Sequence, residues 1–236
     1  MFELVKAVPA SKVKMKVIGI GGGGINAVER MISYNLEGVD FITANTYIRK
    51  LNVSSAPIKI QLGVKLTKGL GAGGNVEVGK RAAIEDKDIL HRHLEGADMV
   101  FITAGLGGGT GTGGAPVVAE ICKELGALTI AVVTKPFHFE GKVRNKQAEK
   151  GIAELRRIVD TLIVIPNQRL LDIGVKNLSL LEVFKKVDDI LYSSVKSISD
   201  LMLVLGRINV DFADVKTIMS HKGLALWECQ PKIDHL

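Results

Sequence analysis

Short, nearly continuous apolar runs alternate with helical patterns along most of this sequence, and this alternation constrains the fold more than any other feature. The runs are rich in β-branched residues and read "KMKVIGIG", "VDFITAN", "ADMVFITAG", "ALTIAVVTKPF" and "DTLIVIPN". Helical patterns such as "INAVERMISYN", "PVVAEICKEL" and "VRNKQAEKGIAELRRI" lie between them. Apolar strands separated by helices are typical of a parallel sheet whose two faces are both covered. We therefore predict an α/β fold with a Rossmann-like parallel sheet.

A long helix is predicted after the last of these runs. Ser179, with Glu182 three residues later, forms a capping box that begins it, and Gly206 ends it. A helix over 179–205 is roughly 40 Å long at about 1.5 Å per residue. This is longer than the sheet requires, so we expect the helix to be packed from a second side. Its apolar residues recur every three or four positions: Leu180, Phe184, Val187, Leu191, Val195, Ile198, Met202 and Leu205.

Two glycine-rich loops stand where predicted strands end and helices begin. Residues 21–24 are all glycine, and residues 104–115 read "AGLGGGTGTGGA". Ligands bind at the carboxyl edge of an open parallel sheet, where glycine lets backbone N–H groups approach and a helix N-terminus favours phosphate. The two loops together predict a phosphate-binding site. A third bare loop, "KGLGAGGN" at 68–75, is placed to fold over a phosphate chain.

Two common nucleotide motifs fit the sequence less well. The segment "GNVEVGKR" has the spacing of a Walker P-loop, but Arg81 stands where Ser or Thr is required and no strand precedes it. The segment "GIGGGGINAV" approximates the Rossmann dinucleotide fingerprint. Asn45 and Thr46, however, occupy the end of the second strand, where an acidic residue is expected. A dinucleotide-binding protein stays open as a weaker alternative at this point.

Charge and cysteine content narrow the functional class further. The net charge is +6, but Lys and Arg are scattered and rarely interleaved with aromatic residues, so we expect an anionic small ligand and no nucleic acid. No apolar run approaches the roughly 18 residues that span a membrane, and the start lacks the apolar core of a signal peptide. Cys122 and Cys229 lie far apart without metal-ligand spacing. We expect a cytoplasmic protein without disulfides, with Cys122 in the core.

Six segments carry a resemblance to a known family. They read "VIGIGGGGINAVERM", "KLTKGLGAGGN", "ADMVFITAGLGGGTGTGGAPVVAEI", "VVTKPFHFEG", "VDTLIVIPN" and "INVDFADVKTIM". In order and spacing they resemble FtsZ, the bacterial relatives of tubulin that polymerise at the division site, and "GGGTGTG" is that family's signature loop. The resemblance covers about residues 13–225. It implies the tubulin/FtsZ GTPase fold, GTP or GDP as ligand with Mg²⁺, and head-to-tail association with itself or with intact FtsZ-like subunits.

The resemblance also implies which residues hold the phosphates. The glycine loops would surround the phosphate chain, and Gly73 and Asn75 would sense the γ-phosphate. The loop residues are Gly21, Gly22, Gly23, Gly24, Gly107, Gly108, Gly109, Thr110, Gly111, Thr112 and Gly113.

Ribose and base contacts are implied in the same way. Glu140 and Arg144 would reach the ribose, although they could equally be a solvated ion pair at a helix start. Asn26, Asn167 and Asp188 would read guanine. Phe184 would stack on the base, whereas by periodicity alone it is a core residue of the long helix.

The segment "NVDFADV" resembles the family's catalytic loop, which enters the nucleotide pocket of the next subunit. Its polar members are Asn209, Asp211 and Asp214, and the two aspartates would orient and polarise the attacking water. The alternative is structural, with Asp211 as a helix N-cap and Asp214 as an acidic first-turn residue.

Some positions depart from the family pattern. Tyr47 stands where the family has an aspartate close to the phosphates and magnesium, and Gln168 replaces another aspartate. After "MSHKGLAL" the pattern stops. We therefore expect the family's carboxyl-terminal domain to be absent, together with the tail that meets membrane anchors, so no direct membrane contact is expected.

The expected organisation follows from this pattern. It comprises a GTP-binding domain (1–178), the long core helix (179–205), a catalytic loop with a remnant of a second domain (206–225) and a tail without family resemblance (226–236). Such a chain is expected to bind nucleotide but to assemble and hydrolyse GTP poorly by itself. A nucleotide-binding fragment that caps filaments without hydrolysis is the alternative.

Overall fold

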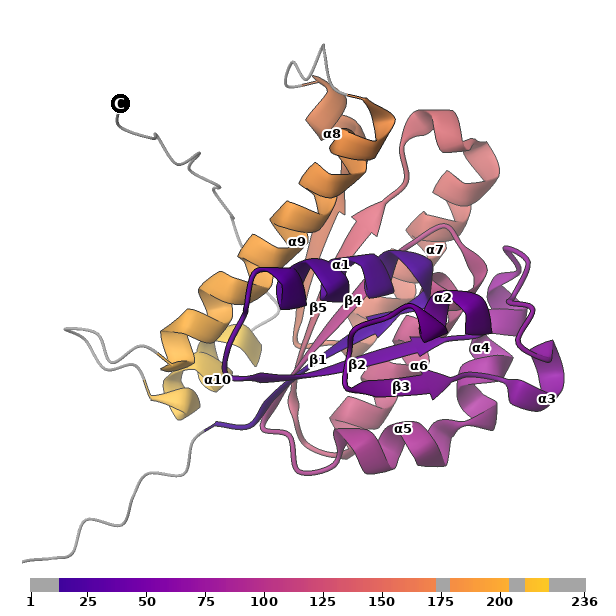
Figure 1. Ribbon diagram of the computed structural model, residues 1–236. Helices are drawn as coiled ribbons and strands as arrows, with labels where there is room; N and C mark the ends of the chain where they lie inside the picture. The colour runs from indigo at the N-terminus through magenta and orange to yellow at the C-terminus, as the bar shows by residue number, and fades with distance from the viewer. Residues whose placement is uncertain (1–12, 173–178, 204–210, 221–236) are drawn as a thin grey trace, which may run out of the picture.

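A six-stranded parallel sheet forms the centre of the molecule in the computed structural model, which describes residues 13–172, 179–203 and 211–220. The strand order is β3-β2-β1-β4-β5-β6, and every pairing is parallel (Figure 1). The predicted α/β class is confirmed. The strands are β1 (Met15–Ile20), β2 (Val39–Asn45), β3 (Ile58–Gln61), β4 (Met99–Gly105), β5 (Leu128–Lys135) and β6 (Thr161–Pro166).

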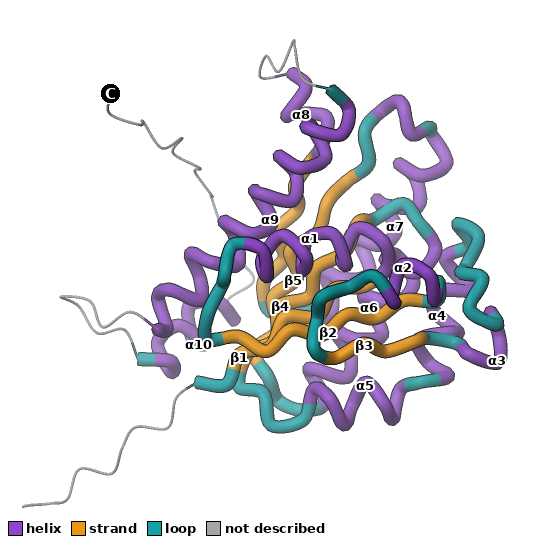
Figure 2. Tube along the Cα trace, in the orientation of Figure 1, coloured by secondary structure: helices purple, strands orange, loops and turns teal. Residues whose placement is uncertain are grey.

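Helices cover both faces of this sheet (Figure 2). Along β1, Val17 faces one apolar core and Ile18 faces the other, and both side chains are fully buried. The apolar runs are continuous because alternate residues enter two separate cores. The helices are α1 (Gly21–Ser33), α2 (Ile48–Asn52), α3 (Val64–Thr67), α4 (Val76–Glu85), α5 (Lys87–Leu94), α6 (Gly109–Glu124), α7 (Lys142–Ile158), α8 (Asn167–Asp172), α9 (Leu180–Leu203) and α10 (Phe212–Ser220), with a 3₁₀ turn η1 (His138–Glu140).

The long helix α9 begins at the predicted capping box. The backbone N–H and the hydroxyl of Ser179 both donate to Glu182 Oε2 over 2.7 Å. The buried apolar residues of this helix are Val183, Val187, Leu191, Val195 and Ile198. Leu180 and Phe184 were also predicted among them, but both are exposed. Phe184 is thus not fully buried in the core, and its role as a base contact stays a prediction. The predicted end of the helix at 204–206 lies outside the described residues.

Helix α10 lies at the amino edge of the sheet, opposite the glycine loops. The Thr161 hydroxyl at the start of β6 donates to Met219 O over 2.9 Å. Lys216 Nζ donates to Gly126 O, two residues before β5, over 3.3 Å. The glycine loops instead follow β1 and β4, at the carboxyl edge. Helix α9 therefore runs from one edge of the sheet to the other (Figure 1).

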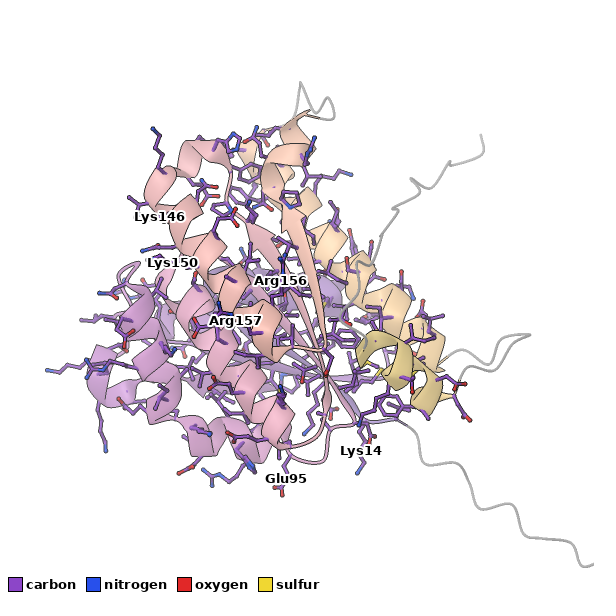
Figure 3. The ribbon with its side chains drawn as sticks, turned by 180° about the vertical axis from the view of Figure 1, so that it is seen from behind. Lys14, Glu95, Lys146, Lys150, Arg156 and Arg157 are labelled. Atoms are coloured by element: carbon purple, nitrogen blue, oxygen red, sulfur yellow. The ribbon has the colours of Figure 1, made fainter. Side chains whose placement is uncertain are left out.

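A group of positive charges lies on the outer surface of α7. Lys146, Lys150, Arg156 and Arg157 are all exposed there (Figure 3). Charged side chains on the outer face of an amphipathic helix are usual for a helix that covers a sheet. The expectation that nucleic acid is not a partner stays a prediction.

Cys122 is fully buried in α6, as predicted, and burial raises the pKa of its thiol to about 12. Cys229 lies outside the described residues. Within the described ranges no helix is long and apolar enough to cross a membrane.

Candidate functional site

A cleft of about 370 Å³ opens at the carboxyl edge of the sheet. Its floor is formed by the two glycine loops, one wall by α9 and the other by η1 and the start of α7. These segments meet because parallel strands bring their carboxyl ends to one edge. The predicted residues that line the cleft are Gly22, Gly23, Asn26, Gly108, Gly109, Thr110, Gly111, Glu140, Arg144, Asn167, Phe184 and Asp188.

The glycines of the two loops have different tasks. A Cβ on Gly22 or Gly108 would meet no atom within 4 Å, and both residues line the cleft. A Cβ on Gly24 would lie 2.4 Å from Thr103 O, and one on Gly113 would lie 2.1 Å from Val76 O. The second pair is needed for close packing of backbone on backbone, not for a ligand. Three further residues that were predicted in the phosphate loops do not line the cleft: Gly21, Gly107 and Thr112.

The two threonines of the signature loop also differ. Thr110 lines the cleft, and its hydroxyl lies 2.7 Å from that of Thr46. Thr112 is fully buried, and its hydroxyl accepts a hydrogen bond from Gly107 N over 2.8 Å. Thr112 therefore holds the shape of the loop, whereas Thr110 contributes to the lining of the cleft.

The third glycine loop borders a second hollow of about 450 Å³, which we call the distal hollow. It shares Gly22, Thr110 and Arg144 with the cleft and is also lined by Gly73. Asn75 is not in its lining. Instead, Asn75 Oδ1 caps α4 by accepting from Glu77 N over 2.9 Å and from Val78 N over 3.3 Å. The sequence alone did not indicate this capping role.

Glu140 and Arg144 form the predicted ion pair at one wall of the cleft. Arg144 donates to Glu140 Oε2 over 2.8 Å, and Phe137 N donates to Glu140 Oε1 over 2.9 Å. The carboxylate side chain is only 18% exposed, so the backbone bond and the arginine together fix it beside the cleft.

The opposite end of the cleft is suited to a planar ring with hydrogen-bond donors. Phe184 packs edge-on against Phe137, with ring centroids 5.2 Å apart, and stands at the mouth of the cleft. Asn167 is 4% exposed, and its Oδ1 is buried without a hydrogen-bond partner among the described residues. A buried acceptor without a partner is costly, and a ligand donor would satisfy it.

Asp188 adds a carboxylate to this end. Burial raises its pKa to about 7; the negative charge of Asp189 adds to the rise, while Arg30 and Lys50 oppose it. Its neighbour Asp189 points to α1, where Arg30 Nε donates to Asp189 Oδ1 over 2.6 Å. The two adjacent carboxylates thus differ in role: Asp189 bonds α9 to α1, and Asp188 lines the cleft.

Comparison with known proteins decides the family. The model of the Tubulin/FtsZ family, GTPase domain, matches residues 14–175. An FtsZ dimer from M. jannaschii, solved empty, is 49% identical over 90% of this chain and 62% of that chain, with a TM-score of 0.85. The chain belongs to the tubulin/FtsZ family. This match sets aside the dinucleotide-binding alternative.

Two further relatives extend the comparison. CetZ2 from Haloferax volcanii, solved as a GTPγS-bound protofilament, is 25% identical over 86% of this chain and 62% of that chain, with a TM-score of 0.72. CetZ1 from the same organism, a GDP-bound monomer, shares the fold, with 24% identity over 89% of this chain and 65% of that chain and a TM-score of 0.74. The chain spans less than two thirds of the length of each of these relatives.

The residues that the FtsZ resemblance assigned to catalysis lie away from the cleft. Asp211 directly precedes α10 and Asp214 lies in its first turn, both exposed and at the amino edge of the sheet. These are the positions expected for an N-cap and a first-turn acidic residue. Asn209 lies outside the described residues. Within one molecule the two aspartates and the cleft are on opposite edges.

The residues at the phosphate end of this family site do not fit a magnesium ion held by the protein. Magnesium in phosphate-transfer sites is usually bound through one or two carboxylates together with the phosphates. The described lining of the distal hollow contains neither Asp nor Glu. Of the two carboxylates in the cleft, Glu140 is engaged by Arg144 and Phe137, and Asp188 lies at the other end.

Several residues of the two linings were not among the predicted site residues, and three of them are polar side chains of interest. Thr46 follows β2, Thr134 lies near the end of β5, and Lys50 lies in the short helix α2. The strand-end positions of Thr46 and Thr134 were a usable signal, because strand ends form this edge. Nothing in the sequence pattern marked Lys50.

Proposed function

We propose that this chain binds GTP or GDP in the cleft, with the base between Phe184, Asn167 and Asp188. Asn167 Oδ1, which has no hydrogen-bond partner among the described residues, and the Asp188 carboxylate both belong to the cleft lining and carry the proposal, because two acceptors require a base that offers donors. Guanine presents donors at N1 and N2, whereas adenine presents an acceptor at N1. An acceptor left unpaired costs about 1–3 kcal/mol, or about tenfold or more in affinity.

The ribose and phosphates then extend along the cleft. We propose Glu140 and Arg144 as the ribose contacts, with the guanidinium nitrogens of Arg144 that Glu140 does not engage left for the phosphates. Gly22 and Gly108 offer the open backbone that a phosphate requires, and Thr110 lies in the same lining. The first turns of α1 and α6 add unpaired N–H groups, which favour the phosphate charge.

Competition binding tests this proposal. A fluorescent GTP analogue is displaced with GTP, GDP, ATP and NAD, using the wild-type chain and Asn167→Ala. We expect GTP and GDP to compete at least about tenfold better than ATP, and Asn167→Ala to weaken GTP by about tenfold with little change for ATP. Equal competition by GTP and ATP would contradict the guanine assignment, and tight NAD binding would favour a dinucleotide site.

We further propose that GTP hydrolysis requires two copies of the chain. Asp188 lies fifteen residues before Leu203 in α9, so the helix carries the chain about 22 Å from the cleft before α10 begins. Asp211 and Asp214 thus cannot reach their own cleft. In a head-to-tail pair they would face the cleft of the neighbour, where carboxylates would orient and polarise water against the terminal phosphate.

Mixing two inactive variants tests this arrangement. Asp188→Ala impairs the cleft but keeps Asp214, and Asp214→Ala does the reverse. Each alone should release phosphate at least about tenfold more slowly than wild type. A mixture should regain activity, since an intact cleft then meets an intact Asp214. Asp88→Ala, an exposed aspartate on α5, is the matched control.

Recovery in the mixture supports shared sites, and a mixture no faster than its components contradicts them. Phosphate release should also rise more steeply than linearly with protein concentration. If GTP binds but no concentration gives phosphate release, the non-hydrolysing, filament-capping alternative is favoured.

The cellular role is proposed from the FtsZ likeness. We propose a cytoplasmic protein that acts in cell division by polymerising at mid-cell. We also propose the division of the chain at 178/179 and 205/206, which the end of the family match at residue 175 supports. A fluorescent fusion that stays diffuse through the division cycle would contradict the proposed location.

A further inference from the structure

The distal hollow continues the cleft towards the third glycine loop. The two spaces share Gly22, Thr110 and Arg144 in their linings. With the base beside Asp188, a phosphate chain that passes Gly22 and Thr110 ends in the distal hollow. The side chains there therefore decide how the charge of the terminal phosphates is balanced.

The oxygen atoms of this hollow are neutral and already engaged. The hydroxyls of Thr46 and Thr110 bond to each other over 2.7 Å, and Asn45 Oδ1 accepts from Tyr47 N over 3.3 Å. Tyr47 itself is 40% exposed and brings a phenol where a carboxylate would be useful to a metal ion. Among the described residues of the lining, no side chain carries negative charge.

Positive charge is present instead. Lys50 on α2 lines the distal hollow, and it also lines a neighbouring hollow with Asn26 and Asp188. Its ammonium makes no direct hydrogen bond or ion pair with a described residue, although its charge acts on Glu29 and Asp188. Arg144 lines the hollow too, and only one of its guanidinium nitrogens is bonded to Glu140. A guanidinium carries five N–H donors, so several remain for phosphate oxygens.

We propose that Lys50 and Arg144 balance the charge of the terminal phosphates in this chain, so that nucleotide binding does not depend on Mg²⁺. The proposal rests on the proposed nucleotide site. A lysine ammonium acts on phosphate as a compact point charge, and arginine adds directed hydrogen bonds. Together they supply at the protein surface the charge that a metal ion would otherwise bring with the nucleotide.

The test is GTP affinity measured with excess Mg²⁺ and with EDTA. The wild-type chain should bind within about threefold under the two conditions. Lys50→Met keeps the length of the side chain and removes its charge. It should weaken binding in EDTA by about tenfold or more, with Mg²⁺ restoring part of the loss. Lys59→Met, on the edge strand β3, makes the same change of net charge away from the hollow and should behave as wild type.

A second variant tests the proposal by adding a negative charge to the distal hollow. Tyr47→Asp places a carboxylate in the lining, which should weaken binding in EDTA and make Mg²⁺ favourable. A wild-type affinity that falls more than about tenfold in EDTA, or a Lys50→Met variant that matches Lys59→Met, would overturn the proposal.

The outcome is separable from that of the proposed function. If GTP and ATP bind equally well, the guanine assignment fails, but the comparison with and without Mg²⁺ still decides the role of Lys50. Absence of nucleotide binding under both conditions would overturn both proposals.

Discussion

Arg30 on α1 donates a hydrogen bond to Asp189 on α9 over 2.6 Å, one residue from the carboxylate that faces the cleft. Tyr34 donates to the same Asp189 oxygen over 3.0 Å, and the Arg30 guanidinium lies 4.4 Å from the centre of the Tyr34 ring. This contact fixes the rotation of α9 about its axis. It therefore determines that Asp188, and not Asp189, is presented to a bound base.

The affinity for GTP should rise with pH through about 7. Burial raises the pKa of Asp188 to about 7, and only the ionised carboxylate offers both oxygens as acceptors to guanine. Below that pH the affinity should fall by up to about tenfold per pH unit. Nucleotide phosphates also titrate in this range, so Asp188→Asn, which cannot ionise, is the control. A wild-type profile parallel to that of the variant would contradict the assignment.

Two substitutions in the contact to α1 should move this profile in opposite directions. The charge of Arg30 lowers the pKa of Asp188 and that of Asp189 raises it. Arg30→Met should therefore shift the midpoint of GTP binding to higher pH, and Asp189→Asn should shift it to lower pH. Both variants break the same ion pair. If only the packing of α9 mattered, both would weaken GTP binding to a similar extent and would not shift its midpoint pH in opposite directions. The measurement is a binding titration at several pH values.

Asp188→Asn should stabilise the nucleotide-free protein at pH 8. The pKa of Asp188 is about 7 in the folded protein and about 3.9 in an unfolded chain. Between these values the folded state holds the extra proton, so the stability contribution of the protonated carboxyl is fully present below about pH 3.9 and is lost progressively as pH rises to about 7. Urea unfolding should show an advantage for the variant on the order of 2 kcal/mol at pH 8 and roughly a third of that at pH 5, where part of the loss has already occurred. An advantage equal at both pH values would mean that ionisation of Asp188 is not its source.

Thr110 and Thr112 should separate binding from folding. Thr112→Val leaves Gly107 N without its acceptor and should destabilise the protein by about 1–3 kcal/mol, because that N–H is buried. Thr110→Val should instead weaken nucleotide binding, since Thr110 lines the cleft. Thermal unfolding and GTP titration of both variants provide the comparison. If Thr112→Val were as stable as wild type and Thr110→Val bound GTP normally, the two roles would be misassigned.

The parts of the fold that could be predicted are those with a local pattern. Runs such as 99–105 are apolar on both faces because two cores cover them, and the sequence shows this directly. Strand β3 was missed because it has four residues at the edge of the sheet, and only Ile60 in it is buried. Short, half-exposed strands carry too little periodicity to be distinguished from loops.

The site was predictable in position but not in detail. Glycine-rich strand ends identified the edge of the sheet, yet whether Gly22 or Gly24 faces the cleft depends on how closely α1 approaches Thr103 O. The choice between Asp188 and Asp189 likewise depends on the packing of α9 against Arg30. These are relations between distant segments, and no local pattern contains them.

The placement of the cleft and of α10 at opposite edges of the sheet gives the molecule a direction. Copies that join cleft to α10 would form a row whose two ends are chemically unlike: one terminal copy presents an uncovered cleft, and the other presents Asp211 and Asp214 to solvent. The rates at which copies join the two ends would then be independent quantities. When a few copies with a substitution in the cleft or in α10 are mixed with intact copies, they would stop growth at the end that they join and leave growth at the other end unchanged.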